Sequence, residues 1–171
     1  MNSALLNSIK DSNRFNDFIL ATIVHVRVGE VAFGTSAGYA EVMATLRAFN
    51  NEDMSKLSDY AVSSTKLIAK ERQLKCETEF VDEFPATTCN PKLTHVVKSI
   101  AGKQNRKIVF IDNPNRWSED FAHFTTLVPS VIFGLGVGEN HPDLHTNSYD
   151  FPDEVISIGV DIMEGIARYM L

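Results

Sequence analysis

The sequence predicts a chain of two parts, an α+β part over residues 1–86 and an α/β part over residues 87–171. In the first part, two runs of alternating apolar and polar residues are joined by a short glycine-bearing connection, which is typical of antiparallel strands. A long helical pattern and a third alternating run follow, which favours an antiparallel sheet with helices on one face. In the second part helices and short apolar runs succeed one another, which favours an α/β layer.

The composition is that of an ordinary globular protein, with 44% hydrophobic and 22% charged residues among 171. The net charge of −6 comes without a cluster of Lys or Arg, so we expect no nucleic-acid partner. No apolar stretch reaches the roughly 18 residues of a spanning helix and no secretory signal is recognisable, so we expect no membrane partner and a cytoplasmic location. Cys76 and Cys89 show neither metal nor disulfide spacing, which fits a reducing compartment.

The first part starts with apolar residues at helical spacing. We expect a short helix that begins near Ser3, and we interpret the apolar cluster at 15–20 as helical too. Strict alternation then predicts a half-exposed strand at 21–28 and its antiparallel partner at 39–49.

A clear amphipathic helix follows, capped by Asn50 or Asn51 and carrying Glu52 and Asp53 in its first turn, where the helix dipole favours negative charge. Its apolar stripe predicts the residues that face the sheet: Met54, Leu57, Tyr60, Ala61, Ser64, Leu67 and Ile68. A third strand is predicted at 75–84, with Pro85 at its end.

The second part alternates between helices and apolar runs. In chain order we expect a helix at 92–103, a strand at 107–112, a short helix at 119–124, a glycine-rich strand at 130–138 and a helix after Pro152. The buried face of that last helix is predicted from its 3.6-residue repeat: Val155, Ile158, Ile162, Ile166 and Met170.

Residues 117–151 concentrate the side chains that can carry chemistry, because an acidic pair, Glu119 and Asp120, precedes a glycine-rich run that leads to His141 and His145. The two histidines are four residues apart, but Pro142 and the absence of a helical pattern argue against a helical two-histidine metal face. Each histidine is therefore either a ligand or an ordinary loop residue.

Arg47 lies within the second predicted strand, between Leu46 and Phe49. A guanidinium in such a place can form a forked pair with a substrate carboxylate. The alternative is that the side chain simply points to water, as most arginines on strands do. The sequence pattern leaves both interpretations open.

Four motifs in order then carry a family resemblance: SEDFAHF, VPSVIFGLGVG, DLHTNSYDF and an acidic start to a terminal helix. They resemble the carboxyl end of the aminoacylase and carboxypeptidase family of metal-dependent amidohydrolases. The strand pair that ends at Thr45-Leu46-Arg47 resembles the family's inserted dimerisation domain. The resemblance implies a dimerisation domain at 1–86 and the carboxyl-terminal half of a zinc-peptidase-like catalytic domain at 87–171.

The resemblance also implies roles for individual residues. His145 matches the family's carboxyl-terminal metal ligand, and an imidazole suits zinc or manganese. Glu119 and Asp120 match the acidic motif and would help to orient the catalytic site, with helix capping as the alternative. Arg47 matches the family's retained arginine and would bind substrate. The implied cofactor is a pair of divalent metal ions.

The same resemblance implies that the amino-terminal half of the catalytic domain, with most metal ligands, is missing here. Two hypotheses follow. Either the chain is part of a metal-dependent amidohydrolase or peptidase that acts on an N-acylated or peptide-like amide and is inactive alone, or it is a non-catalytic dimerisation or regulatory module. In both cases we expect a homodimer.

Overall fold

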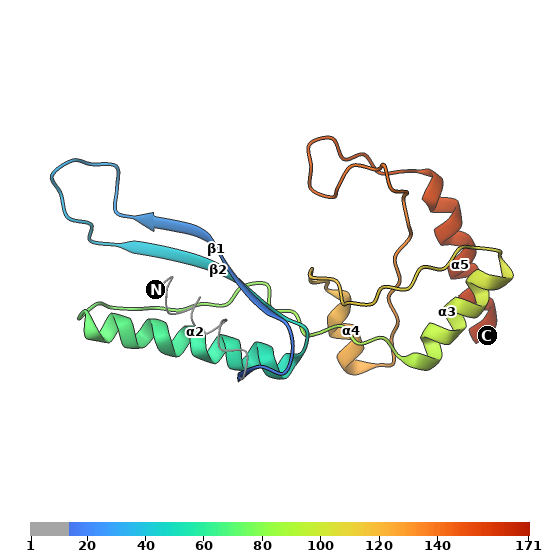
Figure 1. Ribbon diagram of the computed structural model, residues 1–171, viewed down its shortest axis with the longest axis horizontal. Helices are drawn as coiled ribbons and strands as arrows, with labels where there is room; N and C mark the ends of the chain where they lie inside the picture. Colours follow the sequence, from blue (N-terminus) through green and yellow to red (C-terminus); the bar gives the residue numbers. More distant parts are fainter. Residues whose placement is uncertain (1–13) are drawn as a thin grey trace. The chain divides into compact units, whose positions relative to one another are not determined.

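The computed structural model describes residues 14–171, which form two compact units (Figure 1). Unit 1 holds the chain up to Ala86 together with Pro114–Ser118, and unit 2 holds Thr87–Asn113 and Glu119–Leu171. The helix predicted near Ser3 lies outside the described residues. The roles of dimerisation domain and catalytic half for 1–86 and 87–171 remain predictions.

The sheet of unit 1 is an antiparallel hairpin of β1 (Ile19–Val28) and β2 (Ala40–Ala48). A hydrogen bond of 2.8 Å from the Gly29 amide to the Tyr39 carbonyl closes the ladder, and Gly29 adopts a φ of +61° that favours glycine. The hairpin itself confirms the two alternating runs as antiparallel strands. The helix expected over 15–20 is wrong, because residues 15–18 are irregular and β1 already begins at Ile19.

A β-bulge interrupts the alternation of β1. Ile23 pairs with Ala44 and His25 with Met43, so Val24 is an extra residue without a partner on β2. Before the bulge Ala21 is buried, whereas Val24, Val26 and Val28 beyond it are 52–64% exposed. The sheet is therefore covered only over its first half, and the outer half of the hairpin presents apolar side chains to solvent.

Helix α2 (Asn51–Glu71) covers the inner half of this hairpin and contacts both strands. Asn50 caps it, since the Asn50 side chain accepts a hydrogen bond of 2.8 Å from the Asp53 amide. Leu57 lies in the core with no exposed surface, as predicted, but Leu67 is 58% exposed. The helix extends beyond the part of the sheet that it covers, so Leu67 near its end does not pack on the hairpin as predicted.

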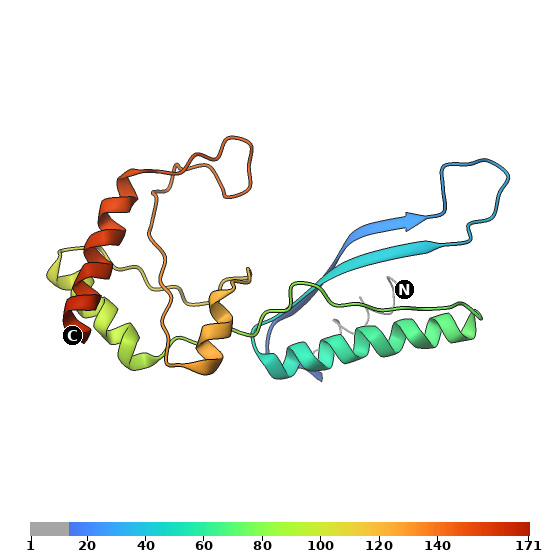
Figure 2. The same cartoon turned by 180° about the vertical axis from the view of Figure 1, so that it is seen from behind.

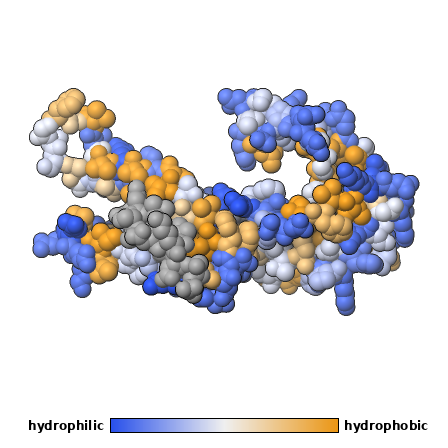
Figure 3. Space-filling model, viewed as in Figure 1, coloured by the Kyte–Doolittle hydropathy of each residue, from blue (hydrophilic) through white to orange (hydrophobic). Residues whose placement is uncertain are grey.

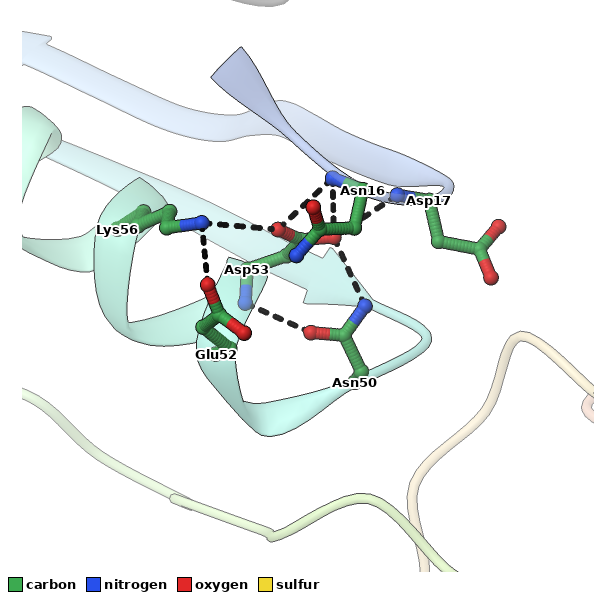
Figure 4. A network of polar contacts seen from close by, with 6 residues as sticks. All are labelled: Asn16, Asp17, Asn50, Glu52, Asp53 and Lys56. Carbon is green, nitrogen blue, oxygen red and sulfur yellow. Dashed lines mark hydrogen bonds and ion pairs between the residues drawn. The ribbon is translucent and has the colours of Figure 1, made fainter.

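The Asp53 carboxylate is fully buried and ties the chain before β1 to the start of α2 (Figure 4). Its two oxygens accept hydrogen bonds of 2.8–3.1 Å from three donors, namely the Asn16 amide, the Asp17 amide and the Asn50 side chain. Burial alone raises the pKa of this carboxyl. The hydrogen bonds and the positive charge of Lys56, 3.9 Å away, outweigh that effect and lower the pKa below its usual value.

The strand predicted at 75–84 is not formed in the structure. These residues follow α2 as an irregular segment that runs back along the helix (Figures 1 and 2), and it is fixed at its end by a hydrogen bond of 2.6 Å from the Ala86 amide to Asn51 Oδ1. Among the described residues only β1 and β2 pair in a sheet. An alternating sequence specifies the two faces of a strand, but the ladder also needs a neighbour with free backbone groups.

Unit 2 contains α3 (Pro91–Lys103), α4 (Phe121–Leu127) and α5 (Glu154–Met170). Asn90 caps α3, because its Oδ1 accepts hydrogen bonds from the Lys92 and Leu93 amides. Helices α3 and α5 pack together where Gly165 lets Ile100 approach; a Cβ added at Gly165 would lie 2.7 Å from Ile100 Cγ2.

The polar side of the α3–α5 pair is held from the end of α3. Gln104 Nε2 donates to the Asp161 carbonyl at 2.8 Å, and Arg106 forms an ion pair of 3.0 Å with the Asp161 carboxylate. On the apolar side of α5, Val155 and Ile162 are buried as predicted, whereas Met170 is 61% exposed. The predicted face is therefore correct except at the carboxyl end of the helix.

The strands predicted at 107–112 and 130–138 are not formed. Within 107–112, Val109, Phe110 and Ile111 are 66–71% exposed. The glycine-rich run makes one backbone–backbone hydrogen bond with another described segment, of 2.7 Å from the Asn90 amide to the Ser130 carbonyl. Both runs have strand-like sequences, but the described residues supply no strand beside them. No helix within residues 14–171 is long and apolar enough to cross a membrane.

Candidate functional site

His145 lies in a tight turn of the exposed loop before α5. The Asp143 carbonyl accepts a hydrogen bond of 3.3 Å from the Thr146 amide and another of 2.8 Å from Thr146 Oγ1. His145 occupies the third position of this turn with a φ of +66°. That position favours glycine or asparagine, and a β-carbon there costs about 1 kcal/mol. The loop thus holds the His145 backbone in a conformation that histidine rarely adopts.

The rest of this loop is held by short-range contacts. The Tyr149 amide donates to the Thr146 carbonyl at 3.1 Å. The rings of His141 and Tyr149 meet edge to face with centroids 5.3 Å apart, and His141 Nδ1 lies 2.9 Å from the Pro142 carbonyl oxygen. His141 is half-buried in these contacts, whereas His145 is exposed. Of the two histidines, His145 has the side chain that is open to a ligand.

Glu119 and Asp120 lie at the start of α4 and are exposed. Their backbone carbonyls accept hydrogen bonds from the Ala122 and His123 amides at 2.9 and 3.1 Å. The Asp120 side chain makes no capping hydrogen bond, so the capping interpretation gains no support for this residue. The helix itself runs over 121–127 rather than the predicted 119–124.

Arg47 lies in β2 and is paired with Leu20 of β1. One guanidinium nitrogen donates a hydrogen bond to the backbone carbonyl of Arg116, within the segment of unit 1 that precedes Glu119. Arg116 in turn lies over the ring of Phe18, with 4.6 Å between its guanidinium carbon and the ring centroid. The side chain of Arg47 is therefore not simply solvent-facing, because it forms a hydrogen bond within unit 1.

These residues do not form a metal centre by themselves. In the part of the chain that the structure describes, no group of three or more His, Cys, Asp or Glu side chains is gathered as a metal ion requires. Glu119, Asp120 and His145 are consequently not brought together as one ligand set. A zinc ion is normally held by at least three protein ligands, so the described residues do not fit a metal pair without others.

Unit 2 is hollowed on its surface at two places among others. An open apolar groove of about 650 Å³ runs along α5, and its lining includes Leu135, Phe151, Ile156, Val160 and Met163. A second hollow of about 370 Å³ lies between residues 88–91 and 125–130 and contains the free thiol of Cys89, whose Sγ is 3.6 Å from the Ile132 carbonyl. Neither hollow holds a group of acids and histidines.

The sequence predicted His145 as a site residue but did not predict the turn that fixes its backbone. The Asp143–Thr146 turn has polar residues at both ends, a local pattern that predicts a turn and could have been recognised. The contact between Arg47 and the Arg116 carbonyl had no sequence signal, because it joins residues 69 positions apart through a backbone atom.

Comparison with known proteins assigns the family. Residues 8–169 match the Peptidase_M20 family, described as peptidase family M20/M25/M40, and the chain belongs to it. An uncharacterized hydrolase of Staphylococcus epidermidis is 25% identical over 84% of this chain and 39% of its own length. Thermostable carboxypeptidase 2 of Saccharolobus solfataricus is 27% identical over 70% of this chain and 31% of its own length.

An N-acetyldiaminopimelate deacetylase of Lactobacillus acidophilus is 32% identical over 44% of this chain and 20% of its own length. The fold is similar to that of a Staphylococcus aureus protein described as an aminohydrolase, with a TM-score of 0.69, 19% identity, and coverage of 97% of this chain and 44% of the other. The resemblance that the motifs indicated is confirmed. The chain spans about two fifths of the length of the first curated relatives that it matches.

Proposed function

We propose that this member of peptidase family M20/M25/M40 is one part of a metal-dependent hydrolase that cleaves an amide bond of an N-acylated or peptide-like substrate. The observation that carries the proposal is the family match over nearly the whole chain. Relatives named as a carboxypeptidase and as a deacetylase support an amide bond as the common target.

In this proposal His145 is the metal ligand that the chain contributes. Its exposed imidazole and its fixed backbone in the Asp143–Thr146 turn support that role. The other ligands in this proposal come from residues that the structure does not describe, since residues 14–171 hold no set of three. Glu119 and Asp120 help to orient the site, and Arg47 binds the substrate; both roles are carried over from the family motif.

The exposed apolar surfaces of unit 2 support the same view. The groove along α5 and the segment 107–112 present large apolar side chains to solvent. Monomeric proteins seldom leave such patches open. Because the first relatives are more than twice as long as the matched part, we propose that residues equivalent to their unmatched part cover these surfaces and complete the catalytic domain.

Metal titration of the 171-residue chain by calorimetry tests the proposal. We expect weak binding of zinc or manganese, because a single imidazole lacks the preformed cluster that offsets desolvation of the ion. Neither His145→Ala nor the control His141→Ala should change it much, and hydrolysis of N-acetyl amino acids should be undetectable.

In a polypeptide extended to the length of the relatives, His145→Ala should reduce metal content and amide hydrolysis strongly, while His141→Ala should leave the metal content unchanged. If the extended protein binds no metal and hydrolyses no amide, the non-catalytic dimerisation or regulatory module is the better description. Tight, stoichiometric binding by the short chain, abolished by His141→Ala alone, would mean that the wrong histidine is assigned.

We also propose that the chain forms a homodimer through unit 1. Among residues 14–171 nothing pairs with the outer edges of the β1–β2 hairpin, valines beyond the bulge are exposed, and the face seen in Figure 3 shows apolar side chains along the hairpin. An open strand edge with apolar neighbours is a template for pairing with another chain. Sedimentation velocity at micromolar concentration should show a dimer, and a monomer throughout that range would contradict the proposal.

A further inference from the structure

The short segment Pro114–Ser118, which we name the strap, belongs to unit 1 although the residues on both sides of it belong to unit 2. The chain leaves unit 2 after Asn113, makes its contacts within unit 1, and re-enters unit 2 at Glu119. Five residues cannot bury an apolar core of their own. The strap must therefore be held by specific attachments to the rest of unit 1.

Two attachments converge on Arg116. Its carbonyl oxygen accepts a hydrogen bond from Arg47 of β2, and its guanidinium carbon lies 4.6 Å from the ring centroid of Phe18. A cation over an aromatic face is attracted by the ring quadrupole. The same residue is thus held through its backbone and through its side chain.

The platform that receives Arg116 is the base of the hairpin. Phe18 immediately precedes β1, and its ring lies 4.8 Å from that of Phe49, measured between centroids. The Phe49 amide also donates to the Phe18 carbonyl at 3.2 Å, and Leu20 pairs with Arg47 in the ladder. Both attachment points therefore lie on backbone that the sheet already orders.

We propose that Arg47, in addition to the substrate-binding role proposed above, is a positioning residue that docks the strap onto the hairpin base. The contact holds the backbone of the strap at Arg116 within unit 1. This docking does not depend on the proposed function.

Arginine and lysine separate this role from direct substrate binding. A carbonyl oxygen needs one donor, and a lysine ammonium can supply it. Forked recognition of a carboxylate requires the planar guanidinium, which lysine lacks. Arg47→Lys should therefore preserve strap docking, and Arg47→Ala should abolish it. If Arg47 acts only on a substrate carboxylate, neither substitution should affect the strap.

Trp117 makes the strap observable, because it is the chain's only tryptophan and follows Arg116 directly. In the 171-residue chain we would measure Trp117 fluorescence anisotropy and, by mass spectrometry, the rate of trypsin cleavage after Arg116. Arg47→Ala should lower the anisotropy and raise the cleavage rate roughly tenfold, as expected when one hydrogen bond from a charged donor is lost. Arg47→Lys should restore most of both properties.

The matched control is Arg27→Ala, which removes another exposed arginine of the hairpin, one that pairs with Glu30 rather than with the strap. It should leave both readouts unchanged. If circular dichroism shows that Arg47→Ala does not fold, the variant Phe18→Leu is used in its place. This substitution removes the aromatic ring under Arg116 but keeps an apolar side chain. It should lower the anisotropy of Trp117 less than the loss of Arg47 would. Unchanged anisotropy and cleavage in a folded Arg47→Ala variant, or equal effects of Arg27→Ala, would overturn the proposal without bearing on the metal titrations.

Discussion

The two units use similar sequence patterns with different results. In unit 1 the runs at β1 and β2 find each other through an 11-residue connection, from Gly29 to Tyr39, and close a ladder under α2. In unit 2 the runs at 107–112 and 130–138 are as apolar, yet they stay unpaired, and the α3–α5 contact supplies much of the packing. The difference teaches that strand-like sequence is realised only where a partner strand lies within reach, because unpaired backbone groups gain nothing from extension.

This comparison predicts unequal stability along the chain. Hydrogen exchange should be slowest in α2 and in the first half of the hairpin, and fast over 107–112 and 130–138, where the described residues offer few backbone partners. Equal, strong protection in both units would contradict the comparison.

The largest expected effect is at Asp53. Asp53→Ala removes the fully buried acceptor of hydrogen bonds from the Asn16 and Asp17 amides and the Asn50 side chain, and hydrogen bonds to a charged group are among the stronger ones. Thermal unfolding followed by Trp117 fluorescence, which reports on unit 1, should show a midpoint lower by roughly 5–10 °C. The control Asp59→Ala, at an exposed position of the same helix, should shift the midpoint by less than about 2 °C.

The pH dependence of unit 1 sharpens this prediction. Because hydrogen bonds hold the pKa of the Asp53 carboxyl below its usual value near 3.8, the folded chain takes up this proton less readily than the unfolded chain. The contribution to stability is therefore complete above about pH 3.8 and is lost as the pH falls through the lowered folded pKa. The urea concentration at the unfolding midpoint, measured between pH 6 and 2, should fall at low pH in the wild type and in Asp59→Asn. In Asp53→Asn the part of this fall that comes from Asp53 should be absent.

In unit 2 the packing of α3 against α5 can be broken at one glycine. Gly165→Ala places a Cβ 2.7 Å from the branched side chain of the buried Ile100. Overpacking costs about 1–3 kcal/mol and exceeds the gain of about 1 kcal/mol from helix propensity. We expect a net loss of about 1 kcal/mol in chemical unfolding followed by circular dichroism, whereas Gly102→Ala, with nothing within 4 Å of its added Cβ, should be neutral or slightly stabilising.

The smallest effect is expected in the loop that carries His145. His145→Gly removes the β-carbon that opposes a φ of +66° and should stabilise the loop by a few tenths of a kcal/mol, after the extra entropy of glycine in the unfolded chain is subtracted. Leu144→Gly, at a neighbouring exposed position without positive φ, should destabilise it by about 0.5 kcal/mol. Equal effects of both changes in hydrogen exchange of this loop would show that the turn is not fixed.

The sequence alone determined the features that depend on neighbours along the chain. Helical periodicity specifies α2, α3 and α5 to within a residue or two, because a helix satisfies its own backbone hydrogen bonds, and of the two caps predicted for α2 the structure selects Asn50. The order of motifs around His145 was sufficient to identify the family, since a motif is itself a local pattern.

Only the tertiary structure decided what depends on distant partners. It left three predicted strands unformed for want of a neighbour, inserted the bulge at Val24, and buried Asp53 against the chain before β1. It also brought Arg47 to the Arg116 carbonyl. Each of these outcomes rests on backbone atoms of remote residues, and backbone atoms are the same in every residue. The pattern of side chains along the sequence therefore does not specify which remote backbone atoms will come into contact.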